Sequence, residues 1–288
     1  MKAVLRHELS SHFTNLTSYV FGAFILLFAG IFSMVINLQS GLTNFEYVLS
    51  NMAFVFLFAV PILTMRIISE ERRQKTDQLL YSLPISMTQV VLGKYLSLLI
   101  LLLVPLAIIS IYPLILSSYG NIYMPAAYGT LVGFFFLGAA LIAIGMFISS
   151  ITESQAIAAG LCFVVMLVNY YLATLAGYIP NSAIASLLAL TVLVVLLVLI
   201  IRSMTRSSFT ALLVGIVLEV GLLGAYVYNA SAFEGLFGKI IDALSLYERF
   251  YVFIDGIFDV TAIVYFMTVI GIFLFLSVQS MEKRRWSE

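Results

Sequence analysis

The chain has 288 residues, of which 62% are hydrophobic and only 10% are charged, and 14 basic residues balance 14 acidic ones. A soluble domain carries roughly 25% charged residues because its surface must face water, so this composition excludes a water-exposed globule. The zero net charge argues against a nucleic-acid partner, and the single cysteine, Cys162, excludes an intrachain disulfide and a cysteine-based metal cluster. We therefore expect the lipid bilayer to surround most of the chain.

Eight apolar stretches are long enough to cross a membrane, since a helix needs about 20 apolar residues to span a hydrocarbon core of about 30 Å. They cover residues 18–36, 48–67, 95–116, 125–149, 156–178, 183–201, 209–228 and 260–278. The N-terminus lacks the pattern of a cleavable signal peptide, so the first stretch is expected to remain in the membrane. The predicted fold class is an all-α integral membrane protein with about eight transmembrane helices in one domain, residues 1–288.

The basic residues predict the orientation of these spans, because lysine and arginine accumulate in cytoplasmic loops. With eight spans and a cytoplasmic N-terminus, only Lys239 and Arg249 face outward. Facing the cytoplasm are Lys2, Arg6, Arg66, Arg72, Arg73, Lys75, Lys94, Arg202, Arg206, Lys283, Arg284 and Arg285. Omitting the two spans around Arg202 leaves six with the same orientation, but both are long and nearly uncharged, which favours eight. A multi-pass protein of the plasma membrane with both termini in the cytoplasm is predicted.

The segment 1–17 has the pattern of a helix in the cytoplasmic interface. Apolar residues recur at helical spacing at Leu5, Leu9, Phe13 and Leu16, and polar residues occupy the other faces. His7 and His12 are five residues apart and have no further ligands nearby, so an interfacial role is favoured over a metal site.

The cytoplasmic segment 69–94 is the longest charged stretch, and its pattern predicts a helix with a docking role rather than a simple connector. Acidic residues begin a run of good helix formers, which suits the helix dipole. Leu79, Leu80 and Leu83 give this helix an apolar edge, Pro84 ends it, and Ser86 can cap the next helix. Leucines exposed to water indicate docking to a partner or to the base of the bundle.

The outward segment 230–258 predicts two short amphipathic helices. Its first apolar face comprises Phe233, Leu236, Phe237, Ile240, Ile241 and Leu244, and the second comprises Phe250, Phe253, Ile254 and Ile257. These helices either restrict access from the outside or anchor the chain at the interface, and the sequence does not decide between the two.

Little in the sequence indicates enzymatic chemistry. There is no G-x-x-x-x-G-K-[ST], H-E-x-x-H or G-x-S-x-G motif, so neither ATP hydrolysis nor another active site is expected in this chain. Glu219 lies within a span, where a charge costs roughly 2.5 to 3.5 kcal/mol, and is either a transport or proton-relay group or a hydrogen-bonded carboxyl. Asn169 either lines a path or bonds a neighbouring helix, and Gly129-x-x-x-Gly133 indicates close helix packing.

Several of these segments resemble ABC-2-type exporter permeases of the gliding-motility-type branch. The resemblance after the second span rests on Glu70-Glu71, Thr76, Leu79-Leu80, Pro84, Ser86 and Gly93-Lys94. Lys75 stands where many members have glycine, a departure associated with that branch. The runs 244–250 and 282–286 and the pair Asp255-Gly256 are also similar to it. The resemblance covers the chain except for the two spans around Arg202.

The resemblance implies a coupling helix over residues 70–83 that sits in a cleft of a separate ATP-binding ABC subunit. The implied coupling residues are Glu70, Glu71, Arg72, Arg73, Thr76, Leu79, Leu80, Leu83, Pro84, Ser86, Gly93 and Lys94. Implied outward re-entrant residues are Phe233, Phe237, Ile241, Tyr247, Arg249, Phe250, Asp255 and Gly256. ATP and Mg would bind to the partner and no cofactor to this chain, which would pair with a second copy or a related permease.

Two other functions remain open at the level of sequence. One is a secondary transporter driven by protons through Glu219. The other is a membrane scaffold that anchors a partner such as an extracellular auxiliary protein. Nothing in the sequence identifies a transported substrate.

Overall fold

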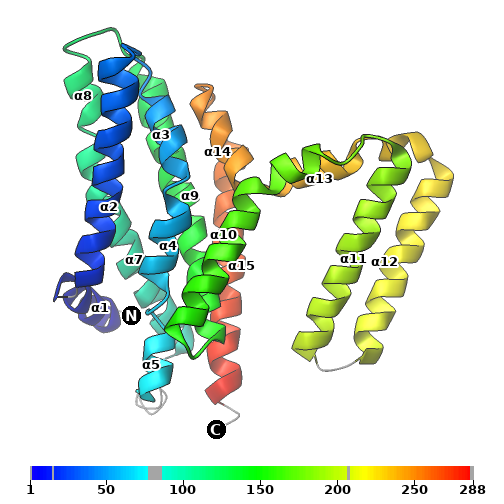
Figure 1. Cartoon of the computed structure of the whole chain (residues 1–288). Coiled ribbons are helices and arrows are strands. Elements are labelled where there is room, and N and C mark those ends of the chain that lie inside the picture. Colours follow the sequence, from blue (N-terminus) through cyan, green and yellow to red (C-terminus); the bar gives the residue numbers. More distant parts are fainter. Residues whose placement is uncertain (1, 15, 77–85, 206–207, 286–288) are drawn as a thin grey trace. The chain divides into compact units, whose positions relative to one another are not determined.

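The computed structural model (Figure 1) describes residues 2–14, 16–76, 86–205 and 208–285. Every regular element among these residues is a helix, so the predicted all-α fold is confirmed. The chain forms two compact units, one of Met1–Tyr170 with Arg249–Glu288 and the other of Tyr171–Glu248. Each unit is described by itself.

The first unit contains most of the apolar helices. Its elements are α1 (Lys2–Thr14), α2 (Leu16–Ser33) with a π-helical continuation (Met34–Gln39), α3 (Glu46–Ala53), α4 (Phe56–Thr64), α5 (Ser69–Gln74), α7 (Met87–Ile109), α8 (Tyr112–Leu116), α9 (Met124–Ile151), α15 (Val260–Arg285), and the parts of α10 (Gln155–Gly177) and α14 (Leu246–Ile254) that fall within it. The second unit contains α11 (Ala183–Thr205), α12 (Ser208–Tyr228), the 3₁₀ turn η2 (Ala230–Phe233) and α13 (Leu236–Leu244).

Helix α9 is the centre of the first unit and packs against α3, α4, α7 and α15 (Figure 1). Of its apolar span, 78% is buried within the protein, against 39% or less in the other candidate spans. Glycines permit these close approaches, because a Cβ at Gly145 would lie 2.4 Å from Thr64 Oγ1 and one at Gly133 2.8 Å from the ring of Phe253. The predicted close packing at Gly133 is thus found, but against α14 rather than against another long helix.

The number of spans differs from the predicted eight. Among the described residues, six helices are long and apolar enough to cross a membrane, or seven if the pair α3 and α4 forms one span. That pair is bent by 56°, and Pro61, which removes a backbone donor, lies inside α4. The apolar part of α11, Ala183–Leu199 among the described residues, is shorter than these helices.

The second outward helix is shorter than predicted. Helix α14 ends at Ile254, and Gly256 has a φ of +76°, a left-handed conformation that glycine adopts without strain. Phe250 and Phe253 are buried, but Ile257 is 58% exposed because it follows the end of the helix. The prediction that Ile257 shares their face is therefore wrong.

The second unit is a helical hairpin, α11 and α12, with η2 and α13 packed against α11. Phe233, Phe237 and Ile241 are buried in its small core together with Ala176 and Leu190. The predicted apolar face is thus confirmed for these three residues, but Leu244 is 50% exposed, and Gly235, with a φ of +66°, separates Phe233 in η2 from helix α13. Whether that helix re-enters the membrane stays a prediction.

Candidate functional site

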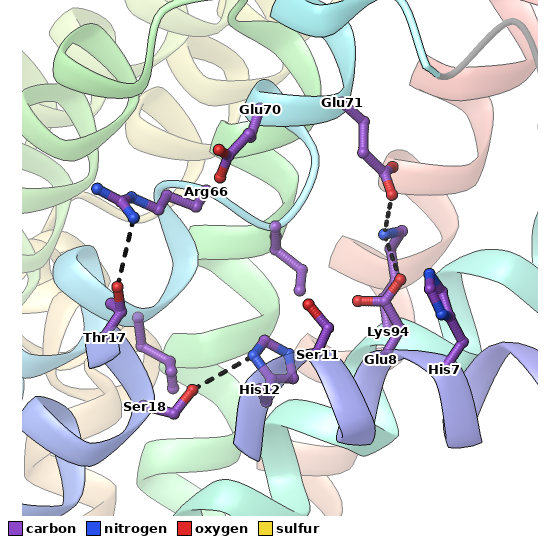
Figure 2. Close-up of a pocket in the computed structure, with 12 residues that line it drawn as sticks. His7, Glu8, Ser11, His12, Thr17, Ser18, Arg66, Glu70, Glu71 and Lys94 are labelled. Carbon is purple, nitrogen blue, oxygen red and sulfur yellow. Dashed lines mark hydrogen bonds and ion pairs between the residues drawn. The ribbon is translucent and has the colours of Figure 1, made fainter. Parts of the chain in front are cut away.

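A polar pocket of about 180 Å³ lies where α1, the start of α2, the end of α4, α5 and the start of α7 meet (Figure 2). It is lined by His7, Glu8, Ser11, His12, Thr17, Ser18, Leu63, Arg66, Ile67, Glu70, Glu71 and Lys94. So many ionisable side chains around one cavity are unusual in a chain with 10% charged residues. The pocket is therefore the main candidate for a functional site.

Lys94 joins three helices at this pocket. Its Nζ lies 2.8 Å from Oε1 of Glu8 on α1 and 2.6 Å from Oε1 of Glu71 on α5, while its side chain is only 1% exposed (Figure 2). An ammonium group taken out of water is costly by several kcal/mol unless carboxylates pair with it. The two carboxylates compensate for this burial, and α1 and α5 are thereby attached to α7. We call Glu8, Glu71 and Lys94 the charge cluster.

The residue before Lys94 explains how α1 reaches the cluster. A Cβ at Gly93 would lie 3.0 Å from Cγ1 of Val4 and 3.4 Å from the backbone nitrogen of Leu5. Glycine therefore lets α1 pack closely on α7, and Glu8, one turn further along α1, then faces Lys94. The Gly93-Lys94 pair thus has one structural role, in which glycine permits the approach and lysine binds the approaching carboxylate.

Side-chain hydrogen bonds hold the start of α5 and the start of α7. Ser149 Oγ of α9 accepts hydrogen bonds from the backbone nitrogens of Ile68 (3.2 Å) and Ser69 (3.1 Å), which begin α5. At the start of α7, the Ser86 hydroxyl accepts a hydrogen bond from the backbone nitrogen of Gln89 at 3.3 Å, which confirms the predicted cap.

The predicted continuous helix over residues 70–83 is wrong, because α5 ends at Gln74. Lys75 adopts a left-handed conformation with φ 56°, and the amides of Lys75 and Thr76 donate to the carbonyls of Arg72 (3.1 Å) and Glu71 (3.0 Å). This is a Schellman ending, at which glycine is the favoured residue. Leu79, Leu80, Leu83 and Pro84 lie outside the described residues.

The remaining predicted coupling residues occupy different environments. Glu70 lines the pocket, and its Oε1 accepts a hydrogen bond from Gln74 at 3.3 Å. Arg72 is 7% exposed, whereas the next residue, Arg73, is exposed. The Thr76 hydroxyl donates to the carbonyl of Glu71 at 3.3 Å and so supports the end of the helix. Of the predicted coupling residues that the structure describes, Glu71 and Lys94 belong to the charge cluster, and Gly93 lies beside it against α1.

Glu8 and His12 are pocket residues that the sequence did not single out as functional. Glu8 had no visible partner in sequence, because Lys94 is 86 residues away. Nδ1 of His12 lies 3.4 Å from Ser18 Oγ. Burial lowers the pKa of His12; the Glu8 carboxylate opposes this shift and the Lys94 ammonium adds to it. In the described part of the chain, no group of three or more His, Cys, Asp or Glu side chains is placed to hold a metal ion.

The predicted outward residues are divided between the two units. In the first unit, Phe250 contacts the ring of Phe134, with centroids 5.9 Å apart, and the guanidinium of Arg249 lies 5.7 Å from the ring centroid of Tyr265. Asp255 and Gly256 are exposed after α14. Phe233, Phe237, Ile241 and Tyr247 belong to the second unit, and the first three are buried in its core.

The two buried polar candidates also lie in different units. Asn169 of α10 is half-buried, and its Oδ1 has no hydrogen-bond partner among the described residues. Glu219 of α12 accepts a hydrogen bond from the hydroxyl of Thr191 on α11 at 2.8 Å. This bond connects the two helices of the hairpin, as the structural interpretation of Glu219 predicts.

The fold and the site define a multi-pass helical membrane protein with a polar assembly at one end of its helices. A family model described as ABC-2 family transporter protein matches residues 3–185, from α1 to the start of α11. The chain therefore belongs to the ABC-2 transporter family. None of the curated proteins with which the sequence was compared matches it.

Membership of this family makes the chain the permease component of an ABC transporter, a transmembrane subunit that is not itself catalytic and whose family implies an ABC ATP-binding partner. The charge cluster and α5 lie inside the matched region, whereas α12, α13 and α14 lie outside it. The gliding-motility-type branch stays a prediction.

Proposed function

We propose that this chain is the membrane-spanning subunit of an ATP-driven exporter. A separate ATPase subunit binds ATP and Mg, and its closure pushes on α5 and the segment that follows it. The resulting rearrangement of the bundle moves a substrate out of the cell. This proposal takes α3 with α4 as one span and α11, whose apolar part Ala183–Leu199 is shorter, as another. Both termini and the polar pocket then lie on the cytoplasmic side of the plasma membrane, in agreement with the distribution of lysine and arginine.

The attachment of α5 to the bundle is the observation that carries this proposal. A short helix can transmit force only if it is held firmly, and α5 has just six residues. Ser149 binds its first backbone amides at 3.1 and 3.2 Å, and Lys94 binds Glu71 at 2.6 Å. Movement of α5 would therefore reach the central helix α9 through Ser149 and helix α7 through Lys94.

The chain needs a partner to work in this way. Export through a central path requires a second permease, either another copy of this chain or a related one. The ATP-binding subunit would contact the exposed side of α5, where Arg73 lies, and the segment 77–85.

Purification of the tagged protein in a mild detergent tests this assembly. Mass spectrometry should identify a Walker-motif subunit in the product, and the product should hydrolyse ATP. A chain that purifies without any ATPase in several detergents would contradict the proposal.

A further inference from the structure

The polar pocket is lined by side chains of both charges. Figure 2 shows Arg66, Thr17, Ser18 and His12 on one side, and Glu71 and Glu8, joined by Lys94, on the other. Glu70 lies near Arg66 in this view, whereas the carboxylates of Glu8 and Glu71 are paired with Lys94. The side with Arg66 thus offers hydrogen-bond donors together with one carboxylate outside the charge cluster.

Arg66 and Glu70 line the pocket but are not part of the charge cluster. Nη1 of Arg66 lies 3.5 Å from the Thr17 hydroxyl, at the limit of a hydrogen bond, and Arg66 forms no ion pair within the described residues. Among the described residues, Glu70 accepts a hydrogen bond from Gln74 and forms no ion pair. One cation and one anion on the same cavity, not paired with each other, suit a ligand that carries both charges.

His12 adds a second unsatisfied polar group to the cation side. Its Nε2 is buried and has no hydrogen-bond partner among the described residues, whereas Nδ1 is near Ser18. If the Ser18 hydroxyl donates to Nδ1, the ring proton is on Nε2, and a buried N–H group then lacks an acceptor. A phosphate oxygen would supply one.

The position of the pocket indicates where such a ligand comes from. Helix α2, a candidate span, begins at Leu16, directly beside Thr17 and Ser18. Leu16 is 75% exposed and Tyr19 is 58% exposed. On α4, Ile62 is one turn from Arg66 and is also exposed. Apolar surface therefore continues from the polar pocket along two helices that pack against each other.

We propose that the pocket binds the headgroup of a zwitterionic phospholipid with a primary amine, phosphatidylethanolamine, from the cytoplasmic leaflet. Arg66, with the hydroxyls of Thr17 and Ser18 and the ring of His12, binds the phosphate. Glu70 binds the ammonium, and the acyl chains lie along α2 and α4. A choline headgroup fits less well, because its quaternary ammonium has no N–H group to donate to Glu70.

Thermal unfolding of the purified chain, with phosphatidylethanolamine or phosphatidylcholine added in mixed micelles, tests this site. Phosphatidylethanolamine should raise the melting temperature more, and Arg66→Gln or Glu70→Gln should weaken its apparent affinity by about tenfold or more, since each removes a charge-assisted hydrogen bond. The matched controls are Arg73→Gln on the exposed side of α5 and Glu153→Gln, whose carboxylate is 68% exposed. Both should keep the wild-type affinity.

Three outcomes would overturn the proposal. Equal stabilisation by the two lipids would show that the amine is not recognised, and a larger effect of phosphatidylglycerol would indicate a site for anionic lipid. An equal effect of soluble phosphoethanolamine would show a headgroup site that does not select a lipid. The assay needs neither ATP nor the ATPase, so its result is independent of the proposed export function.

Discussion

Lys94 is the residue on which the packing of α1 and α5 depends most. Replacing it by methionine would leave Glu8 and Glu71 facing each other without a counter-ion, so we expect Lys94→Met to destabilise the protein by about 3–5 kcal/mol. Thermal unfolding in detergent measures this effect, with Lys75→Met at an exposed position as the control. Equal melting temperatures for the two variants would contradict the assigned role.

A triple variant tests whether the instability of Lys94→Met comes from the unpaired carboxylates of Glu8 and Glu71. Buried ion pairs can often be replaced by apolar side chains of similar size without loss of stability. Replacing Lys94 by methionine together with Glu8 and Glu71 by leucine should therefore recover much of the lost melting temperature.

Lys75 is in a backbone conformation that costs an L-residue about 1–2 kcal/mol. Lys75→Gly should stabilise the end of α5 by about 1 kcal/mol, whereas Lys75→Ala should bring no such gain. Hydrogen exchange of the amides of Lys75 and Thr76, which close the helix, measures the difference. Slower exchange in the alanine variant than in the glycine variant would contradict this explanation.

At the scale of elements, the packing of α1 should depend on pH through His12. The unfolded residue titrates near pH 6.5, and the folded one has a lower pKa. Between these two values the unfolded state binds more protons, so the free energy of unfolding decreases as the pH falls through this window. The other ionisable groups on the pocket are His7, Glu8, Arg66, Glu70, Glu71 and Lys94.

Melting temperatures at about pH 7.5 and about pH 5.5 test this dependence. His12→Gln should reduce the difference between the two conditions, and His7→Gln, at an exposed position, should leave it unchanged. The account of His12 would have to be abandoned if both variants kept the full difference.

The hairpin of α11 and α12 provides the test between export driven by ATP and transport driven by protons. Glutamine at position 219 still accepts the hydrogen bond from Thr191 but cannot carry a proton. Glu219→Gln should therefore preserve both the melting temperature and ATP-dependent activity. Loss of activity at normal stability would support the proton-coupled alternative.

At the scale of the whole molecule, the sequence predicts those features that depend on neighbouring residues. Long apolar stretches give the helices, and Ser86 predicts the start of α7 because a cap is a local interaction. The charge cluster could not be predicted in full, because its α1 member, Glu8, meets Lys94 only through the packing of two distant helices.

The end of α5 could not be predicted from helix propensity. Good helix formers from Glu70 onward predict a long helix, yet Lys75 leaves the helical conformation although lysine usually favours it. Lys75, where the resemblance leads one to expect glycine, is the position where the chain turns. The left-handed conformation at this position favours glycine, and here lysine adopts it.

The family match ends at residue 185, so most of the second unit, Tyr171–Glu248, lies beyond it. This unit has a core of its own, formed by η2, α11, α13 and the end of α10. The charge cluster and α5, on which the proposed transport function rests, both lie in the first unit. The Glu219→Gln variant tests what the hairpin contributes to transport.

The rate of ATP hydrolysis by the purified complex tests the central claim most directly, since the claim is that Glu71 transmits force between the ATPase and the bundle. Glu71→Gln should lower this rate by roughly tenfold, as expected when a charge-assisted hydrogen bond is lost. Glu153→Gln, which removes only an exposed ion pair with Arg284, should keep the wild-type rate. Equal rates for wild type, Glu71→Gln and Glu153→Gln would contradict the account.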